Sequence, residues 1–544
     1  MSDKSERLLG LAMAAFPDLT APERQVVEAA AAAGEVADFQ SDDPEKDDPA
    51  KAETWGEERK VRASVLRWLC KDAAARRLVY PKGLCVVGAR VEGDLDLSFA
   101  RLPFPLVLLS CAIPNEMSLL GARVASIALG GTHTGPITAD GLEVAGGLFL
   151  SEGFHATGEV RLLGSRIRGN LQCNGGTFDN AGDHALSTDG MEVGGGVFLS
   201  QGFYVKGEVG FVGTRIRGNL ACIGGTFENP GGVALSADGL QVSGSVFLSK
   251  GFHATGEVRL LGARIRGNLD CTGGTFENPG GDALTADGLE VGGGVFLRQG
   301  FRATGKVSLA HAKARFLVDD EDSWPDHGNL DLRGFVYEGI VGPTDAERRL
   351  RWLARQYPRP RRRGHYHPQP YEQLAAVLRR AGHVAESKKV LMAKEKDLRK
   401  FGDLGPLAQA WNWFLGLTLG HGYRVRRALG WAAAIVLLGI LFFWLGHRAG
   451  LLSPTFPAPA EAAAPCEKRL DETFCPWVYS LDTFLPIVDL HQEGRWLPNR
   501  GGSDVATLFW PDRRVGITWG LLVCIWFWLE IGLARTFHAH IGLW

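Results

Sequence analysis

The chain has 544 residues, a length that corresponds to about three to five domains. Glycine supplies 71 residues, but 45% of the chain is apolar and 15 residues are Trp, so the composition excludes both a disordered linker and collagen. Lys and Arg total 59 against 61 Asp and Glu, and the formal charge of −2 excludes the overall basic excess of a general nucleic-acid-binding protein.

Residues 1–80 have the pattern of helices. An Ala-rich stretch from Leu19 to Phe39 precedes an acidic break, and the segment from Glu58 to Val79 has apolar residues at helical spacing. The residues that follow predict stacked short strands, and the open end of such a stack needs a cover against edge pairing. We therefore interpret this region as a helical N-terminal cap. Its first residues lack a basic stretch followed by an apolar one, so we expect no secretory signal peptide.

Residues 81–340 contain an internal repeat. The pair Asp-Gly recurs every 49 residues, at Asp140, Asp189, Asp238 and Asp287. Each repeat contains a shorter pattern, here called the beat, in which apolar and small residues alternate and a Gly follows. Between Val258 and Val307 the beat recurs at intervals of 11, 15, 11 and 12 residues. Strands this short, punctuated by Gly, predict a right-handed β-solenoid of roughly ten coils stacked at ~4.8 Å. The protein is therefore expected to be mainly β.

Two details of the repeat carry further expectations. Each 49-residue unit equals two coils of about 22 residues and a small insertion, at residues 179–184, 229–232 and 278–282. Cys173, Cys222 and Cys271 occupy a position that is apolar or small elsewhere, which predicts an inward-facing row of core side chains. Two coils separate successive cysteines by ~10 Å, too far for disulfides.

Residues 341–410 combine a basic segment with a helical hairpin. The hairpin breaks at Gly382 and resembles one tetratricopeptide-type unit, which we interpret as a connector. Eight arginines are interleaved with aromatic residues ahead of it: Arg348, Arg349, Arg351, Arg355, Arg359, Arg361, Arg362 and Arg363. A solvated loop is the simplest interpretation of the basic segment. Among binding partners, anionic membrane lipid is favoured over nucleic acid because apolar runs follow soon after.

Two apolar runs predict transmembrane helices, residues 428–446 and 515–534. The aromatic and basic residues 411–427 suit a segment lying at the membrane interface. Arg426 and Arg427 before the first run favour a cytoplasmic N-terminal region. Arg513 and Arg514 before the second run favour the opposite, but a long N-terminal region without a signal peptide weighs more. Residues 447–514 would then lie outside, and residues 535–544 would form a cytoplasmic tail.

The outer loop contains two candidate features. Cys466 and Cys475 are a candidate disulfide, because an oxidising compartment permits one. The stretch from Tyr479 to Pro498 resembles the pore segment of two-transmembrane ion channels, with Ser480 and Thr483 at loosely similar spacing. Leu485-Pro486-Ile487-Val488 stands where such channels have glycines, so a potassium-type carbonyl filter does not follow.

The stretches VLMAKEKDLRK, WNWFLGLTLGHGYR and YSLDTFLPIVDLHQE, together with the glycine-punctuated beat, resemble a group of bacterial, notably actinobacterial, pentapeptide-repeat-like membrane proteins. That resemblance covers nearly the whole chain and implies a multi-pass protein of the bacterial inner membrane. Members are often labelled membrane-associated oxidoreductases, which implies a cofactor. The sequence has no dinucleotide-binding fingerprint, P-loop, zinc-protease motif or C-x-x-C to support one, so we assign no cofactor, metal or catalytic residue.

Three functions remain, in order of preference. The first is a non-enzymatic, membrane-anchored scaffold or sensor that presents the solenoid to an unknown protein partner in the cytoplasm. The second is a ligand- or partner-gated pore, which requires a homo-oligomer because two spans cannot enclose a channel. The third is a membrane enzyme, with acid and base groups in the outer loop. Candidate pore or loop residues are Asp482, Thr483, Asp489, His491, Glu493 and Glu530, the last within the second span.

The expected domain order is a helical N-terminal cap (1–80), the β-solenoid (81–340), the basic segment and helical hairpin (341–410), an interfacial segment (411–427), transmembrane helix 1 (428–446), an extracytoplasmic loop (447–514), transmembrane helix 2 (515–534) and a C-terminal tail (535–544).

Overall fold

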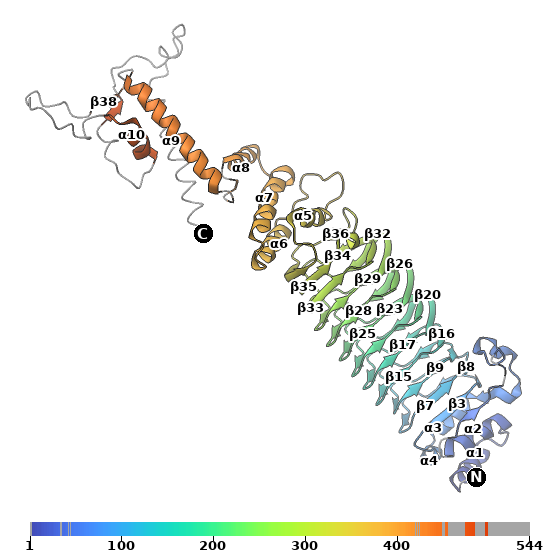
Figure 1. Ribbon diagram of the computed structural model, residues 1–544. Helices are drawn as coiled ribbons and strands as arrows, with labels where there is room; N and C mark the ends of the chain where they lie inside the picture. The colour runs from blue at the N-terminus through green and yellow to red at the C-terminus, as the bar shows by residue number, and fades with distance from the viewer. Residues whose placement is uncertain are drawn as a thin grey trace, which may run out of the picture. The chain divides into compact units, whose positions relative to one another are not determined.

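The computed structural model describes residues 3–32, 35–41, 43, 45–418, 420, 421, 423, 425–448, 452–454, 474–484 and 496–498 (Figure 1). The chain forms two compact units, Met1–Gly402 and Asp403–Trp544. The first unit is a parallel β-solenoid of about 11 turns with helices at both ends. This confirms the mainly β class and the solenoid.

The solenoid strands belong to two sheets. The 21-stranded sheet contains β1 (Ala37–Asp38), β3 (Leu84–Val87), β6 (Arg101–Leu102), β7 (Leu106–Leu109), β10 (Arg123–Val124), β11 (Ile127–Ala128), β14 (Glu143–Val144), β15 (Leu148–Phe149), β18 (Arg166–Ile167), β19 (Leu171–Gln172), β21 (Glu192–Val193), β22 (Val197–Phe198), β24 (Arg215–Ile216), β25 (Leu220–Ala221), β27 (Gln241–Val242), β28 (Val246–Phe247), β30 (Arg264–Ile265), β31 (Leu269–Asp270), β33 (Glu290–Leu297), β35 (Lys313–Asp319) and β37 (Val336–Val341).

The 16-stranded sheet contains β2 (Lys60–Arg62), β4 (Arg90–Glu92), β5 (Leu95–Asp96), β8 (Ala112–Ile113), β9 (Met117–Ser118), β12 (His133–Thr134), β13 (Ile137–Thr138), β16 (His155–Thr157), β17 (Val160–Arg161), β20 (Thr177–Ser187), β23 (Tyr204–Gly210), β26 (Thr226–Ser236), β29 (His253–Arg259), β32 (Thr275–Thr285), β34 (Arg302–Ser308) and β36 (Leu330–Asp331).

The core contains a continuous stack of phenylalanine rings, with one ring from each successive coil. Neighbouring ring centroids lie 5.2–5.4 Å apart, and the stacked residues are Phe154, Phe178, Phe203, Phe227, Phe252, Phe276 and Phe301. Cys173, Cys222 and Cys271 are also fully buried, which confirms their predicted inward position. Each coil therefore buries its apolar side against its neighbours, as the repeat pattern predicts.

The predicted insertions bulge within three long strands. β20, β26 and β32 each have 11 residues, and their pairing with neighbouring strands shifts register across the insertion. In β26 the Asn229 side-chain amide donates to the carbonyl oxygen of Val233 at 2.8 Å, and Asn180 and Asn278 make the same bond in β20 and β32. The extra residues are thus held as a hydrogen-bonded bulge.

The N-terminal cap consists of α1 (Asp3–Ala15), α2 (Ala21–Ala31), α3 (Ala63–Lys71) and α4 (Ala73–Leu78), with 3-10 turns η1 (Pro49–Thr54) and η2 (Glu57–Arg59). In its described residues the cap also contains two short strands, in addition to its helices. β1 pairs with β3 and β2 pairs with β4, so the cap continues both sheets by one short strand each. These strands occupy hydrogen-bonding edges that would otherwise be open.

At the other end of the first unit lie η3 (Glu321–Ser323), α5 (Ala346–Ala354), α6 (Gln369–Arg380) and α7 (Val384–Phe401). Side chains of α6 cover the last coil: Gln369 Nε2 donates to the Phe335 carbonyl at 3.1 Å, and Gln373 Nε2 donates to the Tyr337 carbonyl at 2.6 Å. The predicted helical hairpin, turning at Gly382, is therefore also the cap of this end of the solenoid.

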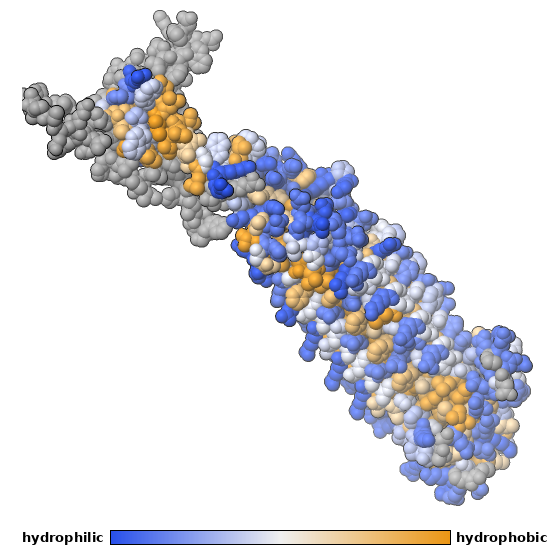
Figure 2. All heavy atoms as spheres, in the orientation of Figure 1, coloured by the Kyte–Doolittle hydropathy of each residue, from blue (hydrophilic) through white to orange (hydrophobic). Residues whose placement is uncertain are grey.

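The described part of the second unit contains α8 (Pro406–Thr418), α9 (Val425–Arg448), α10 (Pro476–Phe484) and the antiparallel pair β38 (Leu452–Pro454) and β39 (Trp496–Pro498). Within the described residues, one helix is long and apolar enough to cross a membrane, Leu429–Arg448. Figure 2 shows a patch of apolar side chains on the described part of the second unit, and Leu437 and Leu438 of this helix are 65% and 57% exposed. The predicted second span, residues 515–534, lies outside the described residues.

Candidate functional site

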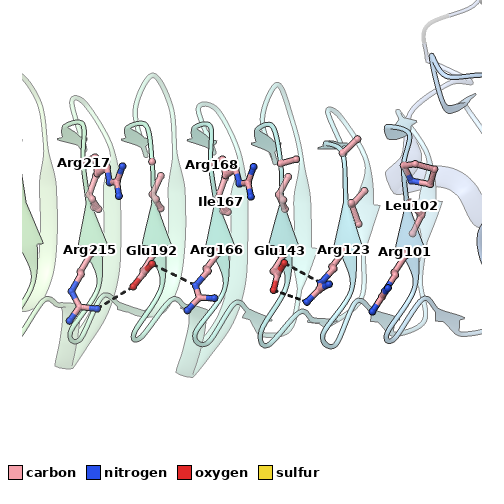
Figure 3. Close-up of a pocket in the computed structure, with 18 of the residues that line it drawn as sticks. Arg101, Leu102, Arg123, Glu143, Arg166, Ile167, Arg168, Glu192, Arg215 and Arg217 are labelled. Carbon is pink, nitrogen blue, oxygen red and sulfur yellow. Dashed lines mark hydrogen bonds and ion pairs between the residues drawn. The ribbon is translucent and has the colours of Figure 1, made fainter.

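A long groove runs along the solenoid on the 21-stranded sheet, from α4 and β6 to β27 (Figure 3). Its volume is about 1170 Å³. The strands that form it alternate strictly: in β18, Arg166 is exposed, Ile167 is buried, and Arg168 beyond the strand is exposed again. The same alternation in each coil places two parallel rows of side chains on the groove surface.

The first row, the charged ladder, is formed by the first residue of each strand. Parallel pairing brings these residues into register in the order Arg101, Arg123, Glu143, Arg166, Glu192, Arg215, Gln241, Arg264, Glu290 and Lys313. Glu192 pairs with arginines on both sides, at 3.6 Å to Arg166 and 3.2 Å to Arg215. Arg101 and Arg123 are neighbours of like charge, and the alternation begins at Arg123. Since such exposed pairs contribute up to about 1 kcal/mol each, the alternation mainly avoids like-charge contacts between the later coils.

The second row, the arginine column, consists of Arg168 and Arg217, which line the groove, and Arg266, which continues the same row one coil beyond it. Each is exposed, and among the described residues none of these three side chains has an acidic or hydrogen-bonding partner. Figure 3 shows Arg168 and Arg217 on the same side of the strands, apart from the charged ladder. The groove therefore offers guanidinium groups that the fold itself does not neutralise.

Small residues separate the members of the arginine column. Gly194 lies between Arg168 and Arg217, and Ser243 lies between Arg217 and Arg266. A Cβ at Gly194 would collide with the carbonyl oxygen of Arg168, and Gly292 stands in the same relation to Arg266. A side chain at either of these two glycines would force the neighbouring backbone to shift, and the equivalent position between Arg217 and Arg266 holds the small residue Ser243, so no large side chain lies between the guanidinium groups.

The candidate lipid-contact arginines lie in different surroundings. Arg349 is fully buried in an ion pair with Asp319, and Arg361 pairs with Asp397 at 2.8 Å while stacking 3.5 Å from the ring centroid of Tyr357. Arg348, Arg351, Arg355, Arg359, Arg362 and Arg363 are exposed or partly exposed. Lipid contact by these six stays a prediction.

Of the candidate pore residues, the structure describes Asp482 and Thr483, both in α10. Asp482 is 4% exposed. Asp489, His491, Glu493 and Glu530 lie outside the described residues, as does Cys466, the predicted disulfide partner of Cys475.

α10 packs against α9 within the second unit, and Figure 1 shows the two helices side by side. The Ser480 hydroxyl donates to the Val436 carbonyl at 3.0 Å, and the rings of Tyr479 and Phe443 lie 4.6 Å apart in an edge-to-face arrangement. Tyr479 and Ser480, the first residues of the stretch that resembles a channel pore segment, are therefore held against the candidate span.

The groove was not among the predicted sites, although the sequence carries its signal. The stretch Arg-Ile-Arg-Gly-Asn occurs three times, from Arg166, Arg215 and Arg264, and alternation around a buried Ile must place both arginines on one face. The 49-residue period alone does not show which residues of the intervening coils lie between the arginines of successive repeats, because that depends on the pairing register.

Among the described residues, no group of three or more His, Cys, Asp or Glu side chains is placed to hold a metal ion. No protein-family model, curated protein or solved structure matches this chain.

Proposed function

We propose that this protein is a membrane-anchored scaffold whose β-solenoid binds an anionic partner in the groove of the charged ladder and the arginine column. The solenoid is right-handed and pentapeptide-repeat-like and faces the cytoplasm of a bacterial cell. Two transmembrane helices hold it at the inner membrane. The arginines before the first apolar run support this orientation.

One observation carries the proposal: the arginine column has three members without any acidic partner in the described structure, whereas five of the six cations of the neighbouring ladder are paired with a glutamate. Unpaired arginines at regular spacing on a rigid surface suit recognition of carboxylate or phosphate groups. An extended surface built from stacked coils is also the usual binding device of repeat proteins.

A site-specific crosslinking experiment tests the scaffold. A photoreactive amino acid replaces Ser243 on the groove floor of the full chain in living bacteria, and the matched control replaces Lys250, which is exposed and outside the groove. We expect a crosslinked partner from position 243 alone, and its loss when Arg168, Arg217 and Arg266 are changed to Gln. Equal products from both positions, or none from position 243, would overturn the proposal.

A pore is the second candidate, favoured by the position of α10. Val436 lies seven residues into the 20-residue candidate span, so the hydrogen bond from Ser480 places α10 at membrane depth when α9 crosses the bilayer. A short helix that enters the membrane without crossing it occurs where it is buried in protein or lines a water-filled path. Asp482 in this helix is a candidate for contact with permeating cations.

Cation flux into liposomes containing the purified full chain tests the pore. We expect flux that disappears in the variant D482A/D489A and persists in D403N, which changes an exposed acidic residue of the same unit. A pore also requires an oligomer in detergent, measured by light scattering. Flux no higher than that of empty liposomes would exclude this function.

A further inference from the structure

The arginine column has a repeat distance that selects among anionic ligands. Its members are 49 residues apart, which is two coils of the solenoid. Adjacent strands in a sheet lie about 4.8 Å apart, so successive guanidinium groups recur every ~9.6 Å along a straight line. A matching ligand must present negative charges in single file at that interval.

An extended polypeptide in the polyproline II conformation meets this requirement. It has three residues per turn and rises about 3.1 Å per residue, so every third side chain faces the same way at intervals of ~9.3 Å. A β-strand does not, because its residues i and i+3 point to opposite faces. Acidic residues at every third position of a polyproline II segment would therefore meet Arg168, Arg217 and Arg266 in turn, each through a bidentate pair.

The charged ladder argues against a nucleic-acid ligand. Glu143 and Glu192 stand between its arginines, where a continuous phosphate backbone would meet carboxylates. None of the residues that line the groove in the described structure is aromatic, so bases would have no stacking surface. A polypeptide avoids both problems, because its charges are spaced along the chain and its basic side chains can pair with the ladder glutamates.

We propose, resting on the scaffold function above, that the groove ligand is an acidic polypeptide segment in the polyproline II conformation with a carboxylate at every third residue. The segment lies along the solenoid axis. The arginine column determines its register, and the small residues Gly194 and Ser243 leave room beside each guanidinium for the carboxylate and the peptide backbone.

Fluorescence anisotropy with the purified full chain in non-ionic detergent tests the ligand class. The probe is a labelled peptide of repeated Glu-Pro-Pro triplets. The control peptide has the same length and the same numbers of Glu and Pro. Its glutamates are placed at every second position from its N-terminus, so the three-residue spacing is lost. We expect the triplet peptide to bind several-fold more tightly than the control, with an affinity that falls as salt rises.

Protein variants assign the binding to the column. R168Q/R217Q/R266Q is expected to weaken triplet-peptide binding roughly tenfold. The matched control K82Q/K250Q/R302Q removes the same charge from exposed positions outside the groove and should change affinity less than about twofold. R168K/R217K/R266K keeps the charge but loses the planar fork, so its affinity should lie between those of the wild type and the Gln variant.

Other outcomes overturn the ligand class in distinct ways. Equal affinity for the two peptides would show that the spacing of the carboxylates does not matter, and would reject the match to the arginine column. Tighter binding of oligothymidylate, lost in R168Q/R217Q/R266Q, would assign the groove to nucleic acid, and column-dependent binding to phosphatidylglycerol vesicles would assign it to lipid. A crosslinked partner at position 243 without triplet-peptide binding would leave the scaffold standing and reject this ligand. Triplet-peptide binding without a crosslinked partner at position 243 would support this ligand class and reject the scaffold.

Discussion

Arg349 and Asp319 form a buried, two-pronged ion pair that joins α5 to the last residue of β35. Arg349 Nη1 lies 2.7 Å from Asp319 Oδ2, and Nη2 lies 2.8 Å from Oδ1. The indole nitrogen of Trp324 donates to the same carboxylate at 2.8 Å. The charge of Asp319 is thereby satisfied away from water, and the helical cap is fixed to the end of the solenoid.

Replacing Arg349 with Met should destabilise this junction by about 3–5 kcal/mol, because a buried carboxylate would lose its only counter-charge in the described surroundings. Hydrogen exchange of the α5 backbone amides in the full chain measures the effect. Arg351→Met is the matched control, since its pair with Glu321 is exposed and contributes less than about 1 kcal/mol. Equal protection of α5 in the two variants would show that the buried pair does not hold the junction.

A second prediction concerns the phenylalanine stack. Phe227 is fully buried, with neighbouring ring centroids at 5.3 Å and 5.2 Å. Phe227→Ala should cost about 3–5 kcal/mol, because it opens a cavity in the middle of the stack. Urea unfolding followed by far-ultraviolet circular dichroism gives the change. Phe99→Ala, at a residue that is 72% exposed, should change stability by less than about 1 kcal/mol, and a similar loss in both variants would contradict a role for stacking.

The period of the sequence predicts the solenoid because each coil repeats the same burial pattern. The Asp-Gly pairs mark turns and the short apolar beats mark strands, and the inward cysteines follow from one apolar position. Roughly ten coils were expected from the beat, against about 11 turns observed. β1 and β2 lie outside the glycine-punctuated beat, so the sheet continuation into the cap had no sequence signal.

The groove depends on information that the period does not contain. Arg166 and Arg215 are visibly equivalent in the repeat, but the residue between them is Glu192, which belongs to the other coil of the 49-residue unit. Only the register of parallel pairing shows that the ladder alternates in charge while the arginine column does not. Residues 447–514 illustrate the other limit: a local resemblance predicted pore residues there, and most of them lie outside the described residues.

Glu23 gives a prediction about pH. Burial raises the pKa of this carboxyl, but the hydrogen bonds from the Arg62 side chain and from the backbone amides of Thr20 and Arg62 outweigh it and lower the pKa below its ordinary value of 4.5. The charged form is therefore favoured in the folded state. Its stabilisation is complete above pH 4.5 and is lost as the pH falls through the lowered pKa.

Hydrogen exchange of the α2 amides between pH 6 and pH 3 tests this. In the wild-type chain, protection should fall below about pH 4.5. Glu23→Gln should already be less stable at pH 6 and should show a smaller further loss on acidification. Glu6→Gln, at an exposed position of α1, controls for the other carboxyl groups and should keep the wild-type profile. An unchanged profile in Glu23→Gln would contradict the assignment.

The last prediction uses the cysteines as reporters of both units. Burial raises the pKa of the Cys222 thiol and raises that of Cys111 to about 12, so neither forms the reactive thiolate near neutral pH. Cys85 is partly exposed.

In the native full chain, a maleimide should therefore modify Cys85 slowly and leave Cys222 and Cys111 unmodified until denaturant is added, as read by mass spectrometry of proteolytic peptides. A disulfide between Cys466 and Cys475 would make those two thiols react only after reduction, whereas unpaired thiols would react without it. Native labelling of Cys222 as fast as that of Cys85 would show that the coils separate readily, which is incompatible with a rigid groove of fixed charge spacing.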